Sequence, residues 1–332
     1  MKAIIKSFLF ALLLVASVAC SGNNATPATT PDRGETRNEP SGEPIRIALL
    51  PITDSVPFYV AEAEGYFDEA GVSVELVPVS SAPDRDILFQ SGEAEGMLTD
   101  LVSTVVVNAG DGPDLVIVRQ MRSAFDDEPM FFLVSGPDSG ISTVEELAGQ
   151  EIGISENSII QYYTERLLTR EGLTLDQIAV TGVPQLPIRL QLLMEGQLPA
   201  AVLPDPLASL AVLQGATIVA SDAAHPEISQ SVLAFGSETI ANRHDEVAAI
   251  VQGWDRAVAA INADPAAYQD VLIANTNVPE PLQAQYSLPR FPEQALPSAA
   301  QIDDVNAWAM EKGLIETAQR ADALVDPQFT KP

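Results

Sequence analysis

The chain has 332 residues, of which 46% are hydrophobic and 19% charged, so it is too apolar to be disordered and long enough for one large or two ordinary domains. Its 46 acidic and 17 basic residues give a net charge of −29, which argues against nucleic acid as a partner and against basic attachment to membranes. With one cysteine and two histidines, an internal disulfide and a cysteine- or histidine-rich metal centre are excluded, and we expect no metal and no cofactor.

The N-terminus has the pattern of a secretory signal over residues 1–19. Its apolar run, residues 8–15, is shorter than the about 20 residues needed to cross a bilayer. Cys20 follows directly, and its position resembles the lipobox of bacterial lipoproteins, although Ser17 stands where that pattern prefers a branched aliphatic residue. The resemblance implies that Cys20 carries several acyl chains, palmitate among them, and anchors the protein stably on the extracytoplasmic face of the cell membrane. The alternative is ordinary signal cleavage that leaves a free thiol.

A flexible tether is predicted after the lipidated cysteine, so that residues 20–44 form the anchor and its linker. Residues 21–44 contain four prolines among mostly polar residues and cannot bury enough surface to fold. Such a chain reaches roughly 25–30 Å on average, which lets a folded domain move above a membrane partner.

From residue 45 onward, short apolar strands alternate with helical stretches. The first series covers residues 45–50, 58–69, 73–78, 84–90, 95–98, 101–109 and 115–119. A second series covers residues 130–134, 143–148, 151–154, 159–170, 178–182, 188–195, 200–203 and 217–220. After an apolar segment at 232–235 the pattern is mostly helical, over residues 243–262, 266–274, 282–287 and 299–313. This alternation predicts an α/β fold with two units built on parallel sheets.

An ordered set of short motifs accompanies this pattern. They are PFYVAEAEGYF at 57–67, SGEAEG at 91–96, ELAGQEIGI at 146–154, EGLTLD at 171–176 and LPDP at 203–206. The set resembles the type II periplasmic solute-binding proteins of ABC importers, in the branch of sulfonate, nitrate and thiamine-pyrimidine binders. The riboflavin-binding RibY group is one candidate within that branch, and the motifs are much less specific for the ligand than for the branch.

The resemblance implies a two-lobed type II periplasmic-binding-protein fold with a ligand cleft between the lobes. Lobe one would comprise residues 45–123 and 235–332, and lobe two residues 124–234, with crossings near 119–123 and 231–235. Elementary physics also favours such a cleft, because parallel sheets bind ligands beyond the carboxyl ends of their strands.

Aromatic residues near predicted strand ends are candidates for stacking on a flat ring, because rigid rings add affinity at little entropic cost. Phe58 and Tyr59 follow the first strand, and the sequence does not decide between them. Tyr162 and Tyr163 begin a predicted helix. Tyr163 lies on the apolar stripe of that helix and is predicted to be core, which leaves Tyr162 as the better ligand contact.

Acidic residues occupy the same loops, and Asp54 and Asp100 have helix N-capping as an equally good alternative role. Carboxylates around a cleft would repel a sulfonate, nitrate or phosphate, and Arg122 is expected to pair with one of them. We therefore expect a neutral or cationic ligand rich in N–H and O–H donors. The predicted ligand-binding set is Asp54, Phe58, Tyr59, Asp100, Arg122, Glu156, Asn157, Tyr162 and Asp205.

These observations predict a monomeric solute-binding lipoprotein that captures a small planar heterocycle, preferably riboflavin, and delivers it to an ABC permease for vitamin uptake. The alternatives are a thiamine pyrimidine precursor, an alkanesulfonate or nitrate as ligand, or a structural surface lipoprotein without a cleft. Catalysis is not expected. The cysteine-rich CCCFC motif of the yeast pyrimidine-precursor synthase, which shares the implied fold, is absent, and His225 and His244 lie in polar surroundings.

Overall fold

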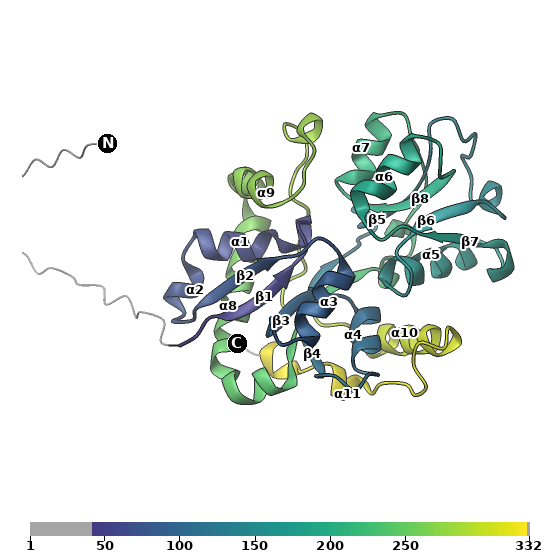
Figure 1. Cartoon of the computed structure of the whole chain (residues 1–332). Coiled ribbons are helices and arrows are strands. Elements are labelled where there is room, and N and C mark those ends of the chain that lie inside the picture. The colour runs from purple at the N-terminus through teal and green to yellow at the C-terminus, as the bar shows by residue number, and fades with distance from the viewer. Residues whose placement is uncertain (1–41, 331–332) are drawn as a thin grey trace, which may run out of the picture. The chain divides into compact units, whose positions relative to one another are not determined.

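The computed structural model describes residues 42–330, which form two five-stranded β-sheets with helices packed against them (Figure 1). The fold is α/β, as predicted from the alternating pattern. The predicted signal, Cys20 and all but the last three residues of the tether lie outside the described residues. Among the described helices, none is long and apolar enough to span a membrane.

The first sheet has the strand order β2-β1-β3-β10-β4. Its strands are β1 (Ile45–Leu49), β2 (Val74–Pro78), β3 (Gly96–Thr99), β4 (Leu115–Ser123) and β10 (Gln230–Gly236). β1 pairs in parallel with β2 and β3, whereas β10 runs antiparallel to both β3 and β4. The prediction of purely parallel sheets is therefore wrong, because the chain returns from the second sheet as an antiparallel strand.

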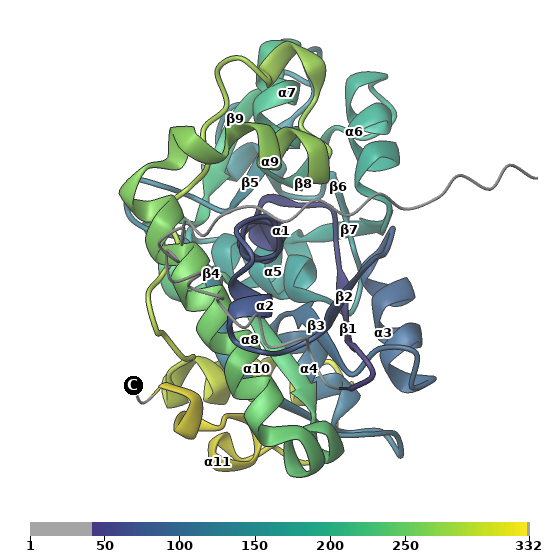
Figure 2. The same ribbon diagram turned by 90° about the vertical axis from the view of Figure 1, so that its left-hand side faces the viewer.

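Helices cover both faces of the first sheet. On one face lie α1 (Val56–Ala63), α2 (Tyr66–Glu69) and α8 (Ser237–Ala263), which pack side by side in Figure 2. On the other face lie α3 (Ala82–Gln90), α4 (Leu101–Val107) and α10 (Ala299–Glu311). Side chains along β1 alternate between these two faces. Ile45, Ile47 and Leu49 belong to the hydrophobic core under α1, α2 and α8, whereas Ala48 belongs to the core under α3, α4 and α10. The short helices α9 (Gln269–Asn275) and α11 (Ala321–Leu324) complete the C-terminal part.

The second sheet has the order β7-β6-β8-β5-β9 and is also mixed, because β5 runs antiparallel to β8 and β9. Its strands are β5 (Phe131–Ser135), β6 (Glu151–Ile154), β7 (Ala179–Gly182), β8 (Ala200–Pro204) and β9 (Thr217–Ser221). α5 (Ile159–Arg170) packs on one face, and α6 (Leu186–Met194) and α7 (Leu207–Leu213) pack on the other. α7 was not anticipated from the sequence.

The chain passes between the sheets twice, from β4 to β5 and from β9 back to β10. All of β10 pairs within the first sheet, so the expected boundary between residues 234 and 235 falls inside a strand. The second passage lies earlier, between Ser221 and Gln230. The carboxylate of Asp222, in this passage, accepts hydrogen bonds from the backbone N–H groups of Met130 and Phe131.

α10 also joins the two parts of the fold, because it packs against α5 as well as α4. The Tyr162 hydroxyl donates to Asp304 at 2.7 Å, and the Trp308 indole N–H donates to Glu165 at 2.8 Å. One hydrophobic cluster therefore runs from the first sheet through α4 and α10 to α5 and the second sheet.

The helix predicted over residues 282–287 is not found in the described part of the chain. A short 3-10 helix, Glu280–Leu282, stands there, followed by turns. Pro289 follows the predicted segment and disfavours a helical conformation in Leu288, so a helix starting at residue 282 is confined to about two turns, which is too short to be stable without strong packing.

Candidate functional site

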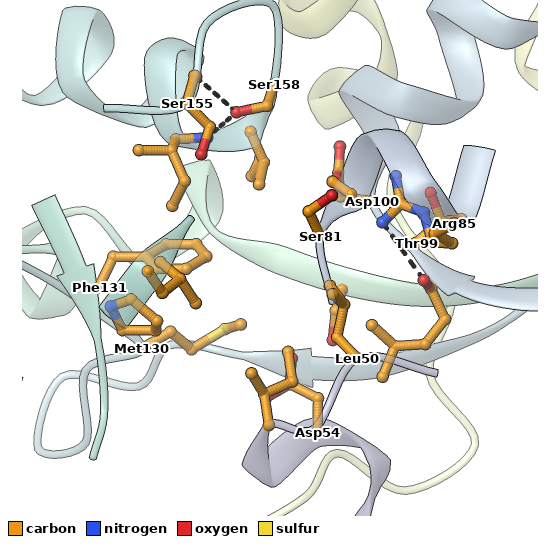
Figure 3. Close-up of a pocket in the computed structure, with 18 of the residues that line it drawn as sticks. Leu50, Asp54, Ser81, Arg85, Thr99, Asp100, Met130, Phe131, Ser155 and Ser158 are labelled. Carbon is orange, nitrogen blue, oxygen red and sulfur yellow. Dashed lines mark hydrogen bonds between the residues drawn. The ribbon is translucent and has the colours of Figure 1, made fainter. Parts of the chain in front are cut away.

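A cavity of about 860 Å³, a volume that includes its open mouth, lies where residues of the two sheets face each other (Figure 3). The first part of the fold lines it with Leu50, Ile52, Asp54, Ser80, Ser81, Ala82, Arg85, Leu98, Thr99, Asp100, Arg122, Gln230 and Ser231. The second part lines it with Met130, Phe131, Ser155, Ser158, Ile159, Ile160, Pro184, Leu186, Pro204 and Asp205.

The position of the cavity follows from the strand directions. Leu50 comes directly after β1, Thr99 and Asp100 stand at the end of β3, and Ser155 comes directly after β6. These are carboxyl ends of parallel strands, where loops and helix N-termini converge. Much of the wall is hydrophobic, and in Figure 3 Met130 and Phe131 lie across the cavity from Leu50 and Ser81.

Arg122 is the central charged group of the site. Its side chain is only 4% exposed, and its Nη1 lies 3.5 Å from Oδ1 of Asp54, whose side chain is 9% exposed. Asp205 and Asp222 are close enough for the Arg122 charge to oppose the rise in their pKa values that burial causes. Arg122 therefore faces several carboxylates and is not a free cation.

The other two cavity carboxylates hold helix starts. Asp100 caps α4, since its carboxylate accepts from the backbone N–H and the hydroxyl of Ser103 at 2.8 and 3.1 Å. Asp205 accepts from the backbone N–H and the hydroxyl of Ser209 at 3.0 and 2.9 Å. Burial raises the pKa of both carboxyls, so each is harder to ionise than an exposed aspartate.

Arg85 is the second cation of the cavity wall and is already bonded. Its Nε donates to Asp86 at 2.8 Å and its Nη2 to Ser103 at 2.9 Å. The negative charge of Asp100 is also balanced in part by Arg85, which acts against the rise in the Asp100 pKa.

Four cavity residues carry buried polar atoms that have no hydrogen-bond partner among residues 42–330. These atoms are Oγ1 of Thr99, Nε of Arg122, Oε1 and Nε2 of Gln230, and Oγ of Ser231. An unsatisfied buried polar group destabilises a fold by about 1–3 kcal/mol, so such a cluster calls for an explanation.

Four of the nine residues predicted for the ligand site line the cavity, namely Asp54, Asp100, Arg122 and Asp205. Phe58 lies in the core against Trp254, with ring centroids 4.8 Å apart. Tyr162 is 1% exposed and packs edge-on to Trp308 in the α5–α10 contact. Tyr163 is core, as its helical stripe predicted.

Tyr59, Glu156 and Asn157 do not line the cavity either. Tyr59 is half-buried on α1, where burial raises the pKa of its hydroxyl. Glu156 and Asn157 are exposed in the turn before α5, and the Glu156 side chain lies over Gly182. Asn157 has a φ of 54°, which turns the chain so that Ser155 and Ser158 on either side face the cavity.

Several cavity residues are missing from the predicted ligand-binding set, above all Thr99, Gln230 and Ser231. A signal for the last two was available, because Gln230 and Ser231 are a polar pair at the start of an otherwise apolar strand. Thr99 likewise stands at a strand end, directly before Asp100.

No cluster of three or more histidine, cysteine, aspartate or glutamate side chains suited to a metal ion exists in residues 42–330. His225 pairs with Glu171 and His244 stacks on Phe329, and neither lines the cavity.

A family model described as NMT1/THI5 like matches residues 52–268 of the chain. No curated protein sequence matches it. Among solved structures, the ligand-binding component of an ABC-type import system from Staphylococcus aureus, with zinc bound, has a TM-score of 0.72 at 15% identity, over 87% of this chain and 98% of that one. The alkanesulfonate-binding protein SsuA from Xanthomonas axonopodis pv. citri, bound to MOPS, scores 0.70 at 18% identity, over 86% and 99%. The periplasmic nitrate-binding protein NrtA from Synechocystis PCC 6803 scores 0.66 at 10% identity, over 88% of each chain. At these identities the likeness establishes the fold.

Proposed function

Because the chain belongs to the NMT1/THI5-like family and has the fold of periplasmic solute-binding proteins of ABC importers, we propose that it is such a solute-binding protein and that it captures a small uncharged heterocycle. The observation that carries the proposal is the cavity between the strand ends of the two sheets, with unpartnered buried polar atoms in its wall.

Those atoms support binding as the role of the cavity. Gln230 is 1% exposed, Thr99 is 1% exposed and Arg122 is 4% exposed, so bulk water does not readily satisfy them. A ligand that supplies their missing partners would remove their free-energy penalty and gain affinity from it. A purely structural surface lipoprotein has no need of such a site.

The charges of the wall support an uncharged ligand. Arg85 and Arg122 are matched by Asp54, Asp100 and Asp205, so no positive charge is left over for an anion. The apolar side chains of Leu50, Ile52 and Phe131 suit the faces of a flat ring. Riboflavin is our preferred ligand, with a thiamine-type aminopyrimidine as the alternative of the same chemical class.

One observation favours a sulfonate instead. The Nε of Arg122 and the hydroxyls of Thr99 and Ser231 are donors without partners in the described part of the chain, and hydrogen-bond donors of this kind suit an oxyanion. Structural neighbours carry names that assign them alkanesulfonate or nitrate. The nearby Asp54 and Asp205 carboxylates weigh against this alternative.

For cellular location, we propose lipid anchoring through Cys20 on the extracytoplasmic face, with residues 21–44 as the tether and delivery to a membrane permease by the monomer. The support is the sequence pattern of the N-terminus. Binding without catalysis fits this role, since His225 and His244 lie away from the cavity.

The test is calorimetric titration of the purified protein, after removal of any copurified ligand by unfolding and refolding, with riboflavin, 4-aminopyrimidine, taurine and nitrate. We expect saturable one-to-one binding of a heterocycle and none of taurine or nitrate. Tight binding of taurine would overturn the proposed ligand class, and failure of all four compounds to bind would count against the cavity as a site for this chemistry.

A further inference from the structure

We propose that the side-chain amide of Gln230 recognises a ring edge on which a hydrogen-bond donor stands beside an acceptor. Such an edge is the N–H and C=O of a lactam or imide, or the amino group and ring nitrogen of an aminopyrimidine. This inference rests on the proposed function and names the group that would select the ligand within its class.

Gln230 is the first residue of β10 and lines the cavity. It is 1% exposed, and both its Oε1 and its Nε2 lack a partner among the described residues. A carboxamide buried in this way is destabilising unless a partner arrives. Because both atoms are unpaired, the conclusion is the same for either orientation of the amide.

Two other cavity residues also have unpartnered polar atoms. Ser231 and Arg122 stand opposite each other in the β10–β4 pairing, and both line the same cavity as Gln230. They are therefore available for other polar groups of a ligand whose ring edge is bound by Gln230.

The acceptor atom of Gln230 decides between ligand classes. A sulfonate or nitrate offers only acceptors, so it satisfies the Nε2 donor and leaves Oε1 buried without a partner. A donor–acceptor edge satisfies both atoms, as glutamine does when it pairs in two places with the adenine edge. Such a bidentate pair changes affinity by roughly 5- to 150-fold.

The experiment compares ligands that differ only at that edge. Wild type should bind riboflavin roughly 5- to 150-fold more tightly than riboflavin methylated at the imide nitrogen, or 4-aminopyrimidine similarly more tightly than 4-dimethylaminopyrimidine. Gln230→Leu should weaken binding of the unmethylated ligand by a similar factor and bring the two members of the pair within about twofold. Gln150→Leu, at an exposed glutamine outside the cavity, is the matched control and should change neither value.

A measurement without ligand separates recognition from a structural role. Gln230→Leu should unfold at the same or a higher temperature than wild type, because it removes an unpaired buried amide, whereas a lower melting temperature would assign Gln230 to the fold and overturn the inference. Equal weakening of both members of a ligand pair would overturn the inference and leave the proposed function standing. Binding of taurine alone would overturn both.

Discussion

The carboxylate of Asp222 accepts a hydrogen bond from the backbone N–H of Met130 at 2.9 Å, which ties together the two passages of the chain between the sheets. The second oxygen of Asp222 accepts from Phe131 at 3.1 Å. Since Met130 and Phe131 line the cavity, this fully buried carboxylate supports one of its walls.

Asp222 should make stability depend on pH. Burial raises the pKa of Asp222 from its ordinary value of 3.8 to about 6. The native state therefore binds a proton more tightly than the unfolded chain, and the contribution of this group to stability increases as pH falls from about 6 toward 3.8. We expect the free energy of unfolding of wild type, relative to that of Asp222→Asn, to be higher at pH 5 than at pH 7 by about 1 kcal/mol. Denaturant unfolding of both proteins at the two pH values measures this difference.

The control for this prediction is Asp126→Asn, at an exposed aspartate. The stability difference between wild type and Asp126→Asn should be the same at pH 7 and at pH 5. A stability difference between wild type and Asp222→Asn that stays constant from pH 7 to pH 5 would contradict the prediction.

Asp54 should restrict the site to uncharged ligands. Replacement of Asp54 by asparagine removes the carboxylate 3.5 Å from Nη1 of Arg122 and leaves that guanidinium with more net positive charge. We expect nitrate binding to strengthen by about 1–2 kcal/mol, roughly tenfold, as judged by calorimetry. Asp126→Asn, at an exposed aspartate outside the cavity lining, serves again as the acidic control. If nitrate binds equally to wild type and Asp54→Asn, the electrostatic argument for the ligand class fails.

The α5–α10 contact should act as the pivot of any closure around the ligand. Tyr162, Glu165 and Trp308 are buried there within a core common to both sheets, so large separation would expose it. On the other side of the cavity, the partly buried Leu210 of α7 packs against the core of the first sheet, and Oγ1 of Thr53 lies 3.5 Å from the backbone oxygen of Asp205. These contacts bury less than the α5–α10 contact does, so closure is expected on that side.

Spin-label distances test this expectation in a variant with Cys20 replaced. Labels at Ile188 and Asn277, which line one groove near the cavity, should approach each other by a few ångströms when ligand is added. Labels at Glu171 and Met310, exposed sites on α5's C-terminal cap and on α10, should keep their separation. Equal movement of both pairs would rule out a pivot at α5–α10.

Cys20 should carry the membrane anchor. Cys20→Ala is expected to release the protein from the membrane fraction with an unchanged melting temperature, because the tether ends before the first strand at Ile45. Ser21→Ala is the neighbouring control and should remain membrane-bound. Retention of Cys20→Ala in washed membranes would refute lipidation at this residue as the anchor.

Local patterns predicted most elements well and long-range contacts poorly. The helix and strand at residues 159–170 and 151–154 occur with the expected bounds, since their periodicity and capping residues lie within the segment itself. The β10 strand was expected, but its antiparallel place between β3 and β4 depends on pairings with residues more than 100 positions earlier.

The same reasoning explains the aromatic residues. Tyr162 lies off the apolar stripe of α5 and so suggested a ligand contact, yet α10 covers it through Asp304 and Trp308, more than 140 residues later. Asp54, Asp100 and Asp205 were placed at the cavity by the strand-end rule, which needs only local sequence. That the Gln230 amide has no hydrogen-bond partner among the described residues could not be predicted from the sequence, because it depends on which residues surround the side chain in the fold.

The place of β10 also dictates the order in which a nascent chain can complete its sheets. All five strands of the second sheet lie between Phe131 and Ser221, so that sheet is whole as soon as this stretch has been synthesised. β3 and β4 precede it, but the strand that joins them ends at Gly236, and until then each offers an open edge. Closing that gap is a long-range event and therefore slow. The sheet that begins the chain is thus the last to be finished, and until residue 236 is in place its open edges are available for incorrect pairing.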